Sequence, residues 1–216
     1  MVNKSLLKAV LTAIILALAV AAPASAKPRK IELAPLPEKF DVSAMAPMLD
    51  QGELIWVNSQ KDGQFKQASI MSIVNATVKK TWDAVTDYDQ YNEFMPRAKK
   101  IIVLSRDGNE AVLSYTIDLP GPDFEYTLRH HHTPYTKVDI WPENDKGDIK
   151  TGAWRWELFP YGENKTILVY TFYTDIRESS WILKIALKSD PSMEHGINIA
   201  TGLVTVNAIK RRAEKQ

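Results

Sequence analysis

Apolar residues follow three different patterns along this chain, and each pattern predicts a different kind of structure. The first is an almost unbroken apolar run from Leu6 to Val20. The second is an alternation of apolar and polar residues, typical of β-strands, which dominates from residue 100 to 175. The third is a recurrence every three or four residues, typical of helices, which appears at residues 76–95 and beyond residue 190.

The alternating segments predict an antiparallel sheet, because breaks as short as those between them can only join antiparallel neighbours. Two strand-like runs come first, on either side of an Asp62-Gly63 turn signal, and they form either a hairpin or one long strand with a bulge. All the predicted strands are Leu54–Gln60, Phe65–Val74, Lys100–Leu104, Ala111–Leu119, Phe124–His132, Lys137–Trp141, Thr151–Phe159 and Thr166–Asp175.

The helical segments predict two short helices and one long one. Asn75 or Thr77 caps the first, and the second spans Tyr88 to Met95 before Pro96. A short apolar segment, Trp181–Leu187, comes before the long helix, which starts at Asp190-Pro191. Its predicted apolar face, flanked by Leu203 and widened by Ile199 and Val206, carries Met193, Ile197, Ala200, Val204 and Ala208.

This order of elements predicts an α+β fold in which a strongly curved antiparallel sheet wraps around the last helix. The segment from Ile73 to Pro96 contains Trp82, Asp87-Tyr88 and Phe94-Met95-Pro96. Together with the closing helix, it resembles the START-like superfamily, which includes the polyketide cyclase/dehydrase and coenzyme Q-binding families. The resemblance runs from about Ile70 to the C-terminus. It implies a helix-grip fold, with two short helices after the first strand and an apolar cavity between sheet and C-terminal helix.

The N-terminal run has the layout of a secretory signal peptide. Lys4 and Lys8 precede the apolar stretch, and Ala24-Ser25-Ala26 supplies small residues for cleavage after Ala26. The run is too short to span a bilayer. We therefore expect a periplasmic or otherwise secreted protein with a signal peptide at 1–26, a Pro-containing leader at 27–52 with a helical turn near 44–50, and a START-like domain at 53–216.

Composition narrows the possible partners. The chain has 27 Lys and Arg residues against 26 Asp and Glu residues, so we expect no nucleic-acid partner. The absence of cysteine excludes disulfides, thiolate metal sites and cysteine nucleophiles. We expect no cofactor. The basic residues at 210–215, with Lys99 and Lys100, predict a solvated helix end, and a transient membrane contact is the alternative.

Strand parity suggests where a ligand would bind, because alternate side chains share one face of a sheet. Large rings recur on one parity of three predicted strands, a pattern that favours a lined pocket, and such pockets are mostly apolar with few polar groups. We expect those polar groups to be Tyr115, Tyr126, His130 and Thr201, with His130 at the pocket mouth. The predicted ligand-binding residues are Tyr91, Met95, Leu113, Tyr115, Ile117, Tyr126, Leu128, His130, Trp154, Trp156, Ile197, Thr201 and Val204.

The three consecutive histidines do not predict a metal site. On a strand His130 and His132 share a face while His131 points away, and no spacing signature supplies a third ligand. The acidic residues Asp87, Asp89 and Glu93 are expected to cap a helix and to be solvated.

These observations support three functional hypotheses. The first is a soluble carrier or sensor for a hydrophobic molecule such as a lipid, isoprenoid, quinone or sterol-like compound, with access between the Tyr88–Met95 helix and the C-terminal helix. The second is a cyclase or dehydratase using Tyr115, His130 and Arg129, although strand parity places Arg129 on the opposite face. The third is an interaction module for an envelope partner. We assign no catalytic residue and favour the carrier.

Overall fold

The structure is a computed structural model that describes residues 31–36, 41–118, 123–177, 185, 187–188, 190 and 192–215. The predicted signal peptide at 1–26 lies outside the described residues. So do parts of the leader, the turn at Pro120-Gly121-Pro122, most of the Trp181–Leu187 segment and Pro191. The expectations for these segments remain predictions.

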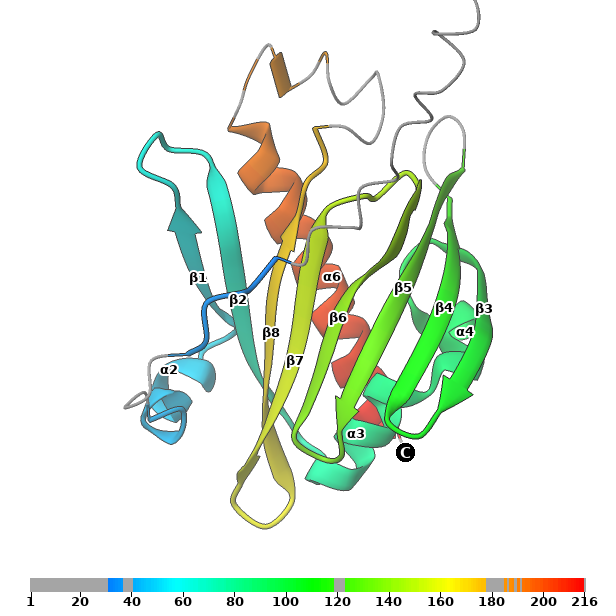
Figure 1. Cartoon of the computed structure of the whole chain (residues 1–216). Coiled ribbons are helices and arrows are strands. Elements are labelled where there is room, and N and C mark those ends of the chain that lie inside the picture. Colours follow the sequence, from blue (N-terminus) through cyan, green and yellow to red (C-terminus); the bar gives the residue numbers. More distant parts are fainter. Residues whose placement is uncertain are drawn as a thin grey trace, which may run out of the picture.

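An eight-stranded antiparallel sheet in the order β1-β2-β8-β7-β6-β5-β4-β3 forms the body of the molecule (Figure 1). The predicted strands are all present, and the first two form a hairpin whose turn contains Gly63 at φ +84°. The bounds of the eight strands are β1 Leu54–Ser59, β2 Phe65–Val74, β3 Ala98–Asp107, β4 Glu110–Ile117, β5 Phe124–Thr133, β6 Lys137–Gly147, β7 Gly152–Tyr161 and β8 Lys165–Thr174.

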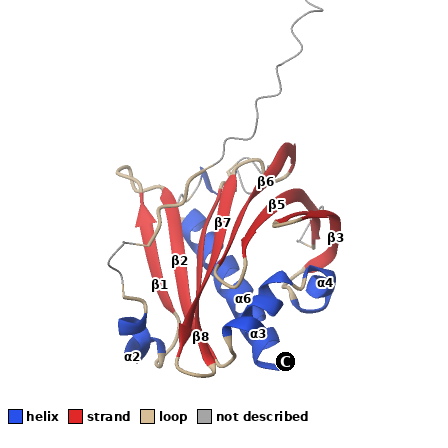
Figure 2. Cartoon of the chain, turned by 60° about the horizontal axis from the view of Figure 1, so that its bottom comes forward, coloured by secondary structure: helices blue, strands red, loops and turns tan. Residues whose placement is uncertain are grey.

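Two short helical segments follow β2 at the positions the sequence predicts. Helix α3 (Val78–Thr86) is capped by Thr77, whose side chain accepts a hydrogen bond from the Lys80 backbone N–H, and it buries Trp82 and Val85. A 3₁₀ turn over Tyr88–Gln90 then leads into α4 (Tyr91–Phe94). Figure 2 shows the β3–β5 end of the sheet curving round towards α4, which gives the sheet its concave face.

The long C-terminal helix α6 (Met193–Lys215) lies against this concave face and packs on β2, β8, α3 and α4 (Figure 1). The predicted α+β helix-grip fold is thereby confirmed. The predicted packing face of the helix is mostly wrong, because Met193 is 40% and Val204 48% exposed. The residues that α6 buries are Glu194, Asn198, Gly202, Val206, Ala208, Ile209 and Ala213.

Close packing and polar pairing explain this buried face. A Cβ on Gly202 would lie 2.5 Å from the Phe172 ring and 2.8 Å from Cδ1 of Ile70, so glycine lets the helix approach the sheet. Asn198 donates from Nδ2 to the Glu194 carbonyl at 3.0 Å, and the Glu194 carboxylate lies 3.6 Å from Nε of Arg177. A pattern of hydrophobic residues alone would place none of Gly202, Asn198 and Glu194 on the buried face of the helix.

The described parts of the leader cover the convex face of the sheet. Residues 31–36 run beside β2, where Gln67 exchanges hydrogen bonds with the backbone of Ala34. A 3₁₀ turn (Ser43–Met45) and α2 (Ala46–Leu49) follow, confirming the helical turn expected near residues 44–50. This leader forms a second apolar cluster with the sheet, made by Val42, Leu49, Met71, Ile73, Ile167 and Val169. The leader is therefore packed against the sheet at β2 and β8.

Candidate functional site

Alternate side chains of β4 and β5 build one wall of the concave face. The two strands pair so that Leu113 lies opposite Leu128 and Tyr115 lies opposite Tyr126. The Tyr115 and Tyr126 rings stack with their centroids 5.1 Å apart. The predicted parity of both strands is confirmed, and it directs rings and aliphatic side chains to the same side.

Strands β7 and β8 continue this wall with further rings. Trp156 stacks on Tyr170 at 4.0 Å between centroids, and Tyr170 stacks on Phe172 at 5.1 Å. Trp154 donates from its indole N–H to the Thr174 hydroxyl at 3.1 Å. Tyr170 and Phe172 were not among the predicted site residues. The alternation Leu168, Tyr170, Phe172 carries the same signal as β7, so a parity argument applied to β8 would have found them.

His130 lies deep in this face and not at a pocket mouth, so that expectation is wrong. Only 2% of the residue is exposed, and its Nε2 is hydrogen bonded to the Tyr115 hydroxyl at 3.0 Å. Among the described residues its buried Nδ1 has no hydrogen-bond partner. Burial lowers the pKa of His130 to about 3, so the imidazole is neutral at physiological pH.

Five tyrosine hydroxyls lie in or beside the ring-lined face, and burial raises the pKa of every one. Besides Tyr115, Tyr91 donates to the Val85 carbonyl, and Tyr88 is hydrogen bonded to Nε2 of His132 at 2.7 Å. Tyr126 and Tyr170 make no hydrogen bond through their hydroxyls to any described residue. These groups therefore stay protonated and neutral, and two of them are free to bind a polar atom.

The structure brings most of the predicted site residues together and leaves a few apart. Tyr91, Met95 and the predicted residues of β4, β5 and β7 belong to one apolar cluster or, in the case of His130, lie within it. On α6, Ile197 is half-buried, whereas Thr201 and Val204 are exposed. Arg129, the candidate for acid–base chemistry, points to the convex face and binds Glu143 with both Nε and Nη2, at 2.6 and 2.7 Å.

A pocket of about 310 Å³ lies between α4 and α6, where the sequence analysis placed the access route. Arg212 spans this gap, with its guanidinium 2.7 Å from the Asp87 carboxylate and 5.2 Å from the centre of the Phe94 ring. Ala208 lies one helical turn before Arg212 and lines the same pocket. The contact between the two helices is therefore partly open, and Arg212 lies across it.

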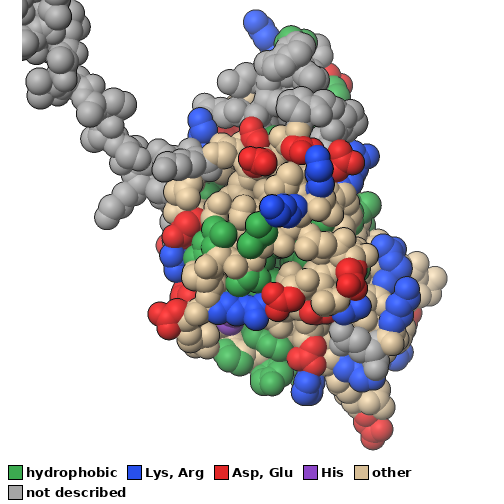
Figure 3. Space-filling model, turned by 90° about the vertical axis from the view of Figure 1, so that its right-hand side faces the viewer, with side chains coloured by type: hydrophobic (Ala, Val, Ile, Leu, Met, Phe, Trp, Pro, Cys, Tyr) green, Lys and Arg blue, Asp and Glu red, His purple; other side chains and the backbone are tan. Residues whose placement is uncertain are grey.

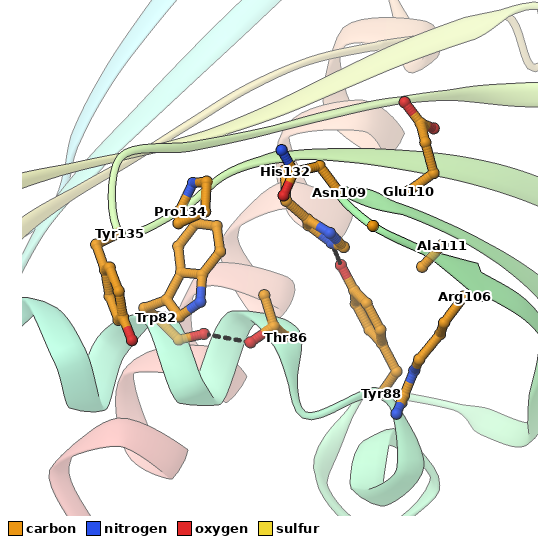
Figure 4. A pocket seen from close by; sticks show the side chains of 11 residues that line it. Trp82, Thr86, Tyr88, Arg106, Asn109, Glu110, Ala111, His132, Pro134 and Tyr135 are labelled. Carbon is orange, nitrogen blue, oxygen red and sulfur yellow. Dashed lines mark hydrogen bonds between the residues drawn. The ribbon is translucent and has the colours of Figure 1, made fainter.

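A second pocket of about 310 Å³ lies at the end of the sheet where the β3–β4 and β5–β6 turns meet α3 (Figure 4). Trp82, Tyr135 and His132 give it an aromatic side, while Glu110 points away from these rings (Figure 4). The Tyr88–His132 hydrogen bond lies on its inner side, and the Tyr88 ring also meets the His130 ring at 4.9 Å. This pair separates the pocket from the ring-lined face.

Charges on the surface are mixed. Figure 3, which views the β3 side, shows hydrophobic side chains in the middle of the face with acidic and basic side chains interspersed around them. Ile102 and Leu104 of β3 are among the exposed apolar residues. Within the described part of the chain, no three His, Asp or Glu side chains gather in a way that could hold a metal ion. No described helix is long and apolar enough to cross a membrane.

A curved sheet closed by a C-terminal helix, with a neutral ring-lined concave face, defines a ligand-binding helix-grip domain. The chain belongs to the polyketide cyclase/dehydrase and lipid transport family, whose model matches residues 74–190, more than half of its length. The matched part leaves out the leader, β1, the whole of α6 and most of β2. A comparison with curated proteins finds no match.

Solved structures with the same fold include an aromatase/cyclase and a lipid transfer protein. The Zhui aromatase/cyclase from Streptomyces sp. R1128 is 17% identical, with a TM-score of 0.55 over 69% of this chain and 94% of that one. A STAR-related lipid transfer protein from Xanthomonas axonopodis is 13% identical, with a TM-score of 0.56 over 77% of this chain and 95% of that one. A START superfamily protein from Mycobacterium smegmatis is 15% identical, with a TM-score of 0.52 over 69% of this chain and 97% of that one. At these identities the likeness establishes the fold alone.

Proposed function

We propose that this protein is an exported, soluble carrier or sensor that holds one hydrophobic small molecule between the concave face and α6. The observation that carries the proposal is the chemistry of that face, where rings and aliphatic side chains surround a few neutral polar groups. Pockets of this composition bind apolar ligands. Burial of the ligand's apolar surface would supply the affinity, at about 25 cal/mol per Å².

Several side chains on the two sides of the site, the sheet with α4 on one side and α6 on the other, are not fully buried, which supports a space for such a ligand. Tyr126, Ile117 and Met95 are only partly buried on the sheet and α4 side. On α6, Thr201 is exposed. It lies on the same side of the helix as Ala208 and Arg212, because these residues follow it by about two and three helical turns. These side chains are therefore not fully packed against one another.

The binding test uses the mature protein and a matched pair of variants on adjacent residues. Ile117 faces inward and Thr116 faces outward on β4. We expect Ile117→Arg to abolish binding of the uncharged fluorescent probe N-phenyl-1-naphthylamine, because it places a cation in the apolar site, and Thr116→Arg to bind the probe normally. Native mass spectrometry should show a co-purifying ligand. A delipidated wild-type protein that binds no hydrophobic probe would overturn the proposal.

Access is proposed at the gap between α4 and α6. Since Arg212 of α6 contacts the Phe94 ring of α4 and pairs with Asp87, which precedes the 3₁₀ turn leading into α4, its removal should ease the separation of the two helices. We expect Arg212→Ala to speed probe release several-fold while changing equilibrium affinity little, measured by stopped-flow fluorescence. Unchanged release rates would place the access route elsewhere.

Export is proposed from the N-terminal pattern at 1–26. The expected result is a mature chain in the periplasmic or secreted fraction that starts at Lys27, determined by N-terminal sequencing. In that compartment, a soluble protein that shields an apolar molecule would carry it across an aqueous space, with transient contact at a membrane.

The Tyr115–His130 pair keeps a cyclase-type reaction as a second candidate, because two titratable groups do converge within 3.0 Å. Their properties favour binding over acid–base chemistry, however. Burial lowers the pKa of His130 to about 3 and raises that of Tyr115 well above its usual value. Neither group has the pKa near 7 that general acid–base catalysis favours. Turnover of an aromatic polyketide substrate that is lost in both Tyr115→Phe and His130→Ala would establish the enzyme instead.

A further inference from the structure

We infer that the concave site selects uncharged ligands that carry one hydrogen-bond acceptor, a carbonyl or hydroxyl oxygen, and that the hydroxyls of Tyr115, Tyr126 and Tyr170 hold that polar end. The inference rests on the proposed function and adds the chemical class of the ligand. His130 acts in it as a positioning residue for Tyr115.

The first observation is a pair of tyrosine hydroxyls without partners in the ring-lined face. Tyr170 is only 9% exposed and Tyr126 is half-buried, and neither hydroxyl is hydrogen bonded to any described residue. Neither oxygen is fully enclosed, so each hydroxyl has space beside it that a ligand atom can occupy. The Tyr115 and Tyr126 rings stack at 5.1 Å between centroids, and Tyr170 lies on the same concave face, where it stacks on Trp156. An oxygen atom of a bound ligand would satisfy these donors.

The second observation concerns the tautomer of His130. Its two nitrogens are unequal, since Nε2 is bonded to Tyr115 and the buried Nδ1 has no partner among the described residues. An orphaned N–H is rarer in proteins than an orphaned acceptor, so the proton belongs on Nε2. His130 then donates to the Tyr115 oxygen, which leaves the Tyr115 hydroxyl proton free for the ligand.

The third observation is the distribution of charge. Along β4, β5, β7 and β8, the inward positions hold rings, aliphatic side chains, the two histidines His130 and His132, and threonines, and the Asp, Glu, Lys and Arg side chains of these strands point outward. The guanidinium at the α4–α6 gap, that of Arg212, is already paired with Asp87. A ligand carboxylate or phosphate at the tyrosines would therefore be buried without a counter-ion, which is strongly unfavourable.

The experiment compares ligands of equal chain length by displacement of N-phenyl-1-naphthylamine from the full mature protein. Dodecanol and methyl dodecanoate are expected to compete, and dodecanoate at pH 8 to be at least about 100-fold weaker. Below pH 5, where a carboxylic acid takes up its proton, the acid should approach the alcohol in affinity. Dodecanoate that competes as well as dodecanol at pH 8, and loses affinity in Arg212→Ala, would place the polar end at the α4–α6 gap and overturn the inference.

Variants test the hydroxyls separately from the shape of the site. Tyr126→Phe and Tyr170→Phe should each weaken methyl dodecanoate by about 3- to 10-fold, and by more than they weaken the probe, which has no oxygen acceptor. His130→Phe should weaken the ester in the wild-type background but not in Tyr115→Phe, and His130→Gln, which retains an amide donor, should restore part of the loss. Unchanged ester affinity in all the tyrosine variants overturns the inference. Failure of the wild type to bind even the probe would instead contradict the proposed function.

Discussion

The concave and convex faces of the sheet are built from the same strands but have different chemistry. On the concave side of β5 and β7, Leu128, His130, Trp154 and Trp156 are buried among rings. On the convex side of the same strands, Arg129 pairs with Glu143, and Arg155 pairs with Asp139 at 2.6 Å. Only under the leader, at β2 and β8, is the convex side also apolar. The sheet therefore separates a neutral binding face from a charged outer face. The leader covers the apolar part of the outer face, at β2 and β8.

The largest expected effect comes from removing the leader. A chain that starts at Gln51 loses Leu33, Val42 and Leu49 and uncovers Ile167 and Val169. Because each fully buried aliphatic side chain contributes about 1.5–3 kcal/mol, we expect the free energy of unfolding to fall by about 4 kcal/mol or more, measured by urea denaturation. A chain that starts at Ile31 keeps every described leader contact and serves as the control. Equal stability of the two chains would show that the second cluster contributes little.

Overpacking the helix–sheet contact tests the concave side. Gly202→Leu forces a side chain into the Phe172 ring and should cost about 2–3 kcal/mol of unfolding free energy. Gly196→Ala is a matched control on the same helix, since its Cβ would meet nothing within 4 Å. That change should raise the free energy of unfolding by up to about 1 kcal/mol through helix propensity. Similar losses in both variants would contradict the close approach at Gly202.

A pH series distinguishes the buried histidine from its neighbour on the other face. Burial places the folded-state pKa of His130 at about 3, below an unfolded value near 6.5. The unfolded chain therefore binds more protons between these values, so the stabilisation present above pH 6.5 is lost as the pH falls. From pH 7 to pH 4.5 we expect a loss of about 2–3 kcal/mol from this group.

The variants His130→Phe and His131→Gln isolate that loss. His130→Phe should flatten the acid limb of the stability profile, while His131→Gln, on the convex face, should keep it steep. Burial also lowers the pKa of His132, so flattening will be incomplete. An acid limb that is equally steep in wild type and His130→Phe would contradict a neutral, buried His130.

The smallest effect is expected on the charged side. Arg129 and Glu143 are each about a third exposed, so solvent screens their ion pair. Arg129→Met should lower the free energy of unfolding by no more than about 1 kcal/mol and leave probe binding unchanged. A loss of binding would mean that the convex face contributes to the site after all.

The sequence predicted much of the fold and of the concave wall because those features depend on periodicity. Alternation in β4, β5 and β7 correctly placed Tyr115, Tyr126 and Trp156 on one face. The packing face of α6 could not be found in this way, because a glycine and a paired Glu194–Asn198 occupy buried positions. A pattern based on hydrophobicity gives such residues to the solvent side.

The packing of the leader on the sheet was not predicted, for a different reason. Its proline-containing sequence has no periodicity, and its burial depends on a sheet face formed by distant residues. A signal was nevertheless present in the strands beneath it. Residues 70–74 and 167–170 are apolar at nearly every position, which is typical of strands covered on both faces.

The strand order also governs when the molecule can fold. On one side β2 pairs with its hairpin neighbour β1, and on the other with β8, where Ala68 lies opposite Phe172. Strands β3 to β7 lie between β2 and β8 in the chain. Long-range pairing of this kind slows folding, because a large loop must close before the contacts form. In a chain that is synthesised from its N-terminus, the backbone edge of β2 that pairs with β8 therefore stays unpaired until β8 has been made.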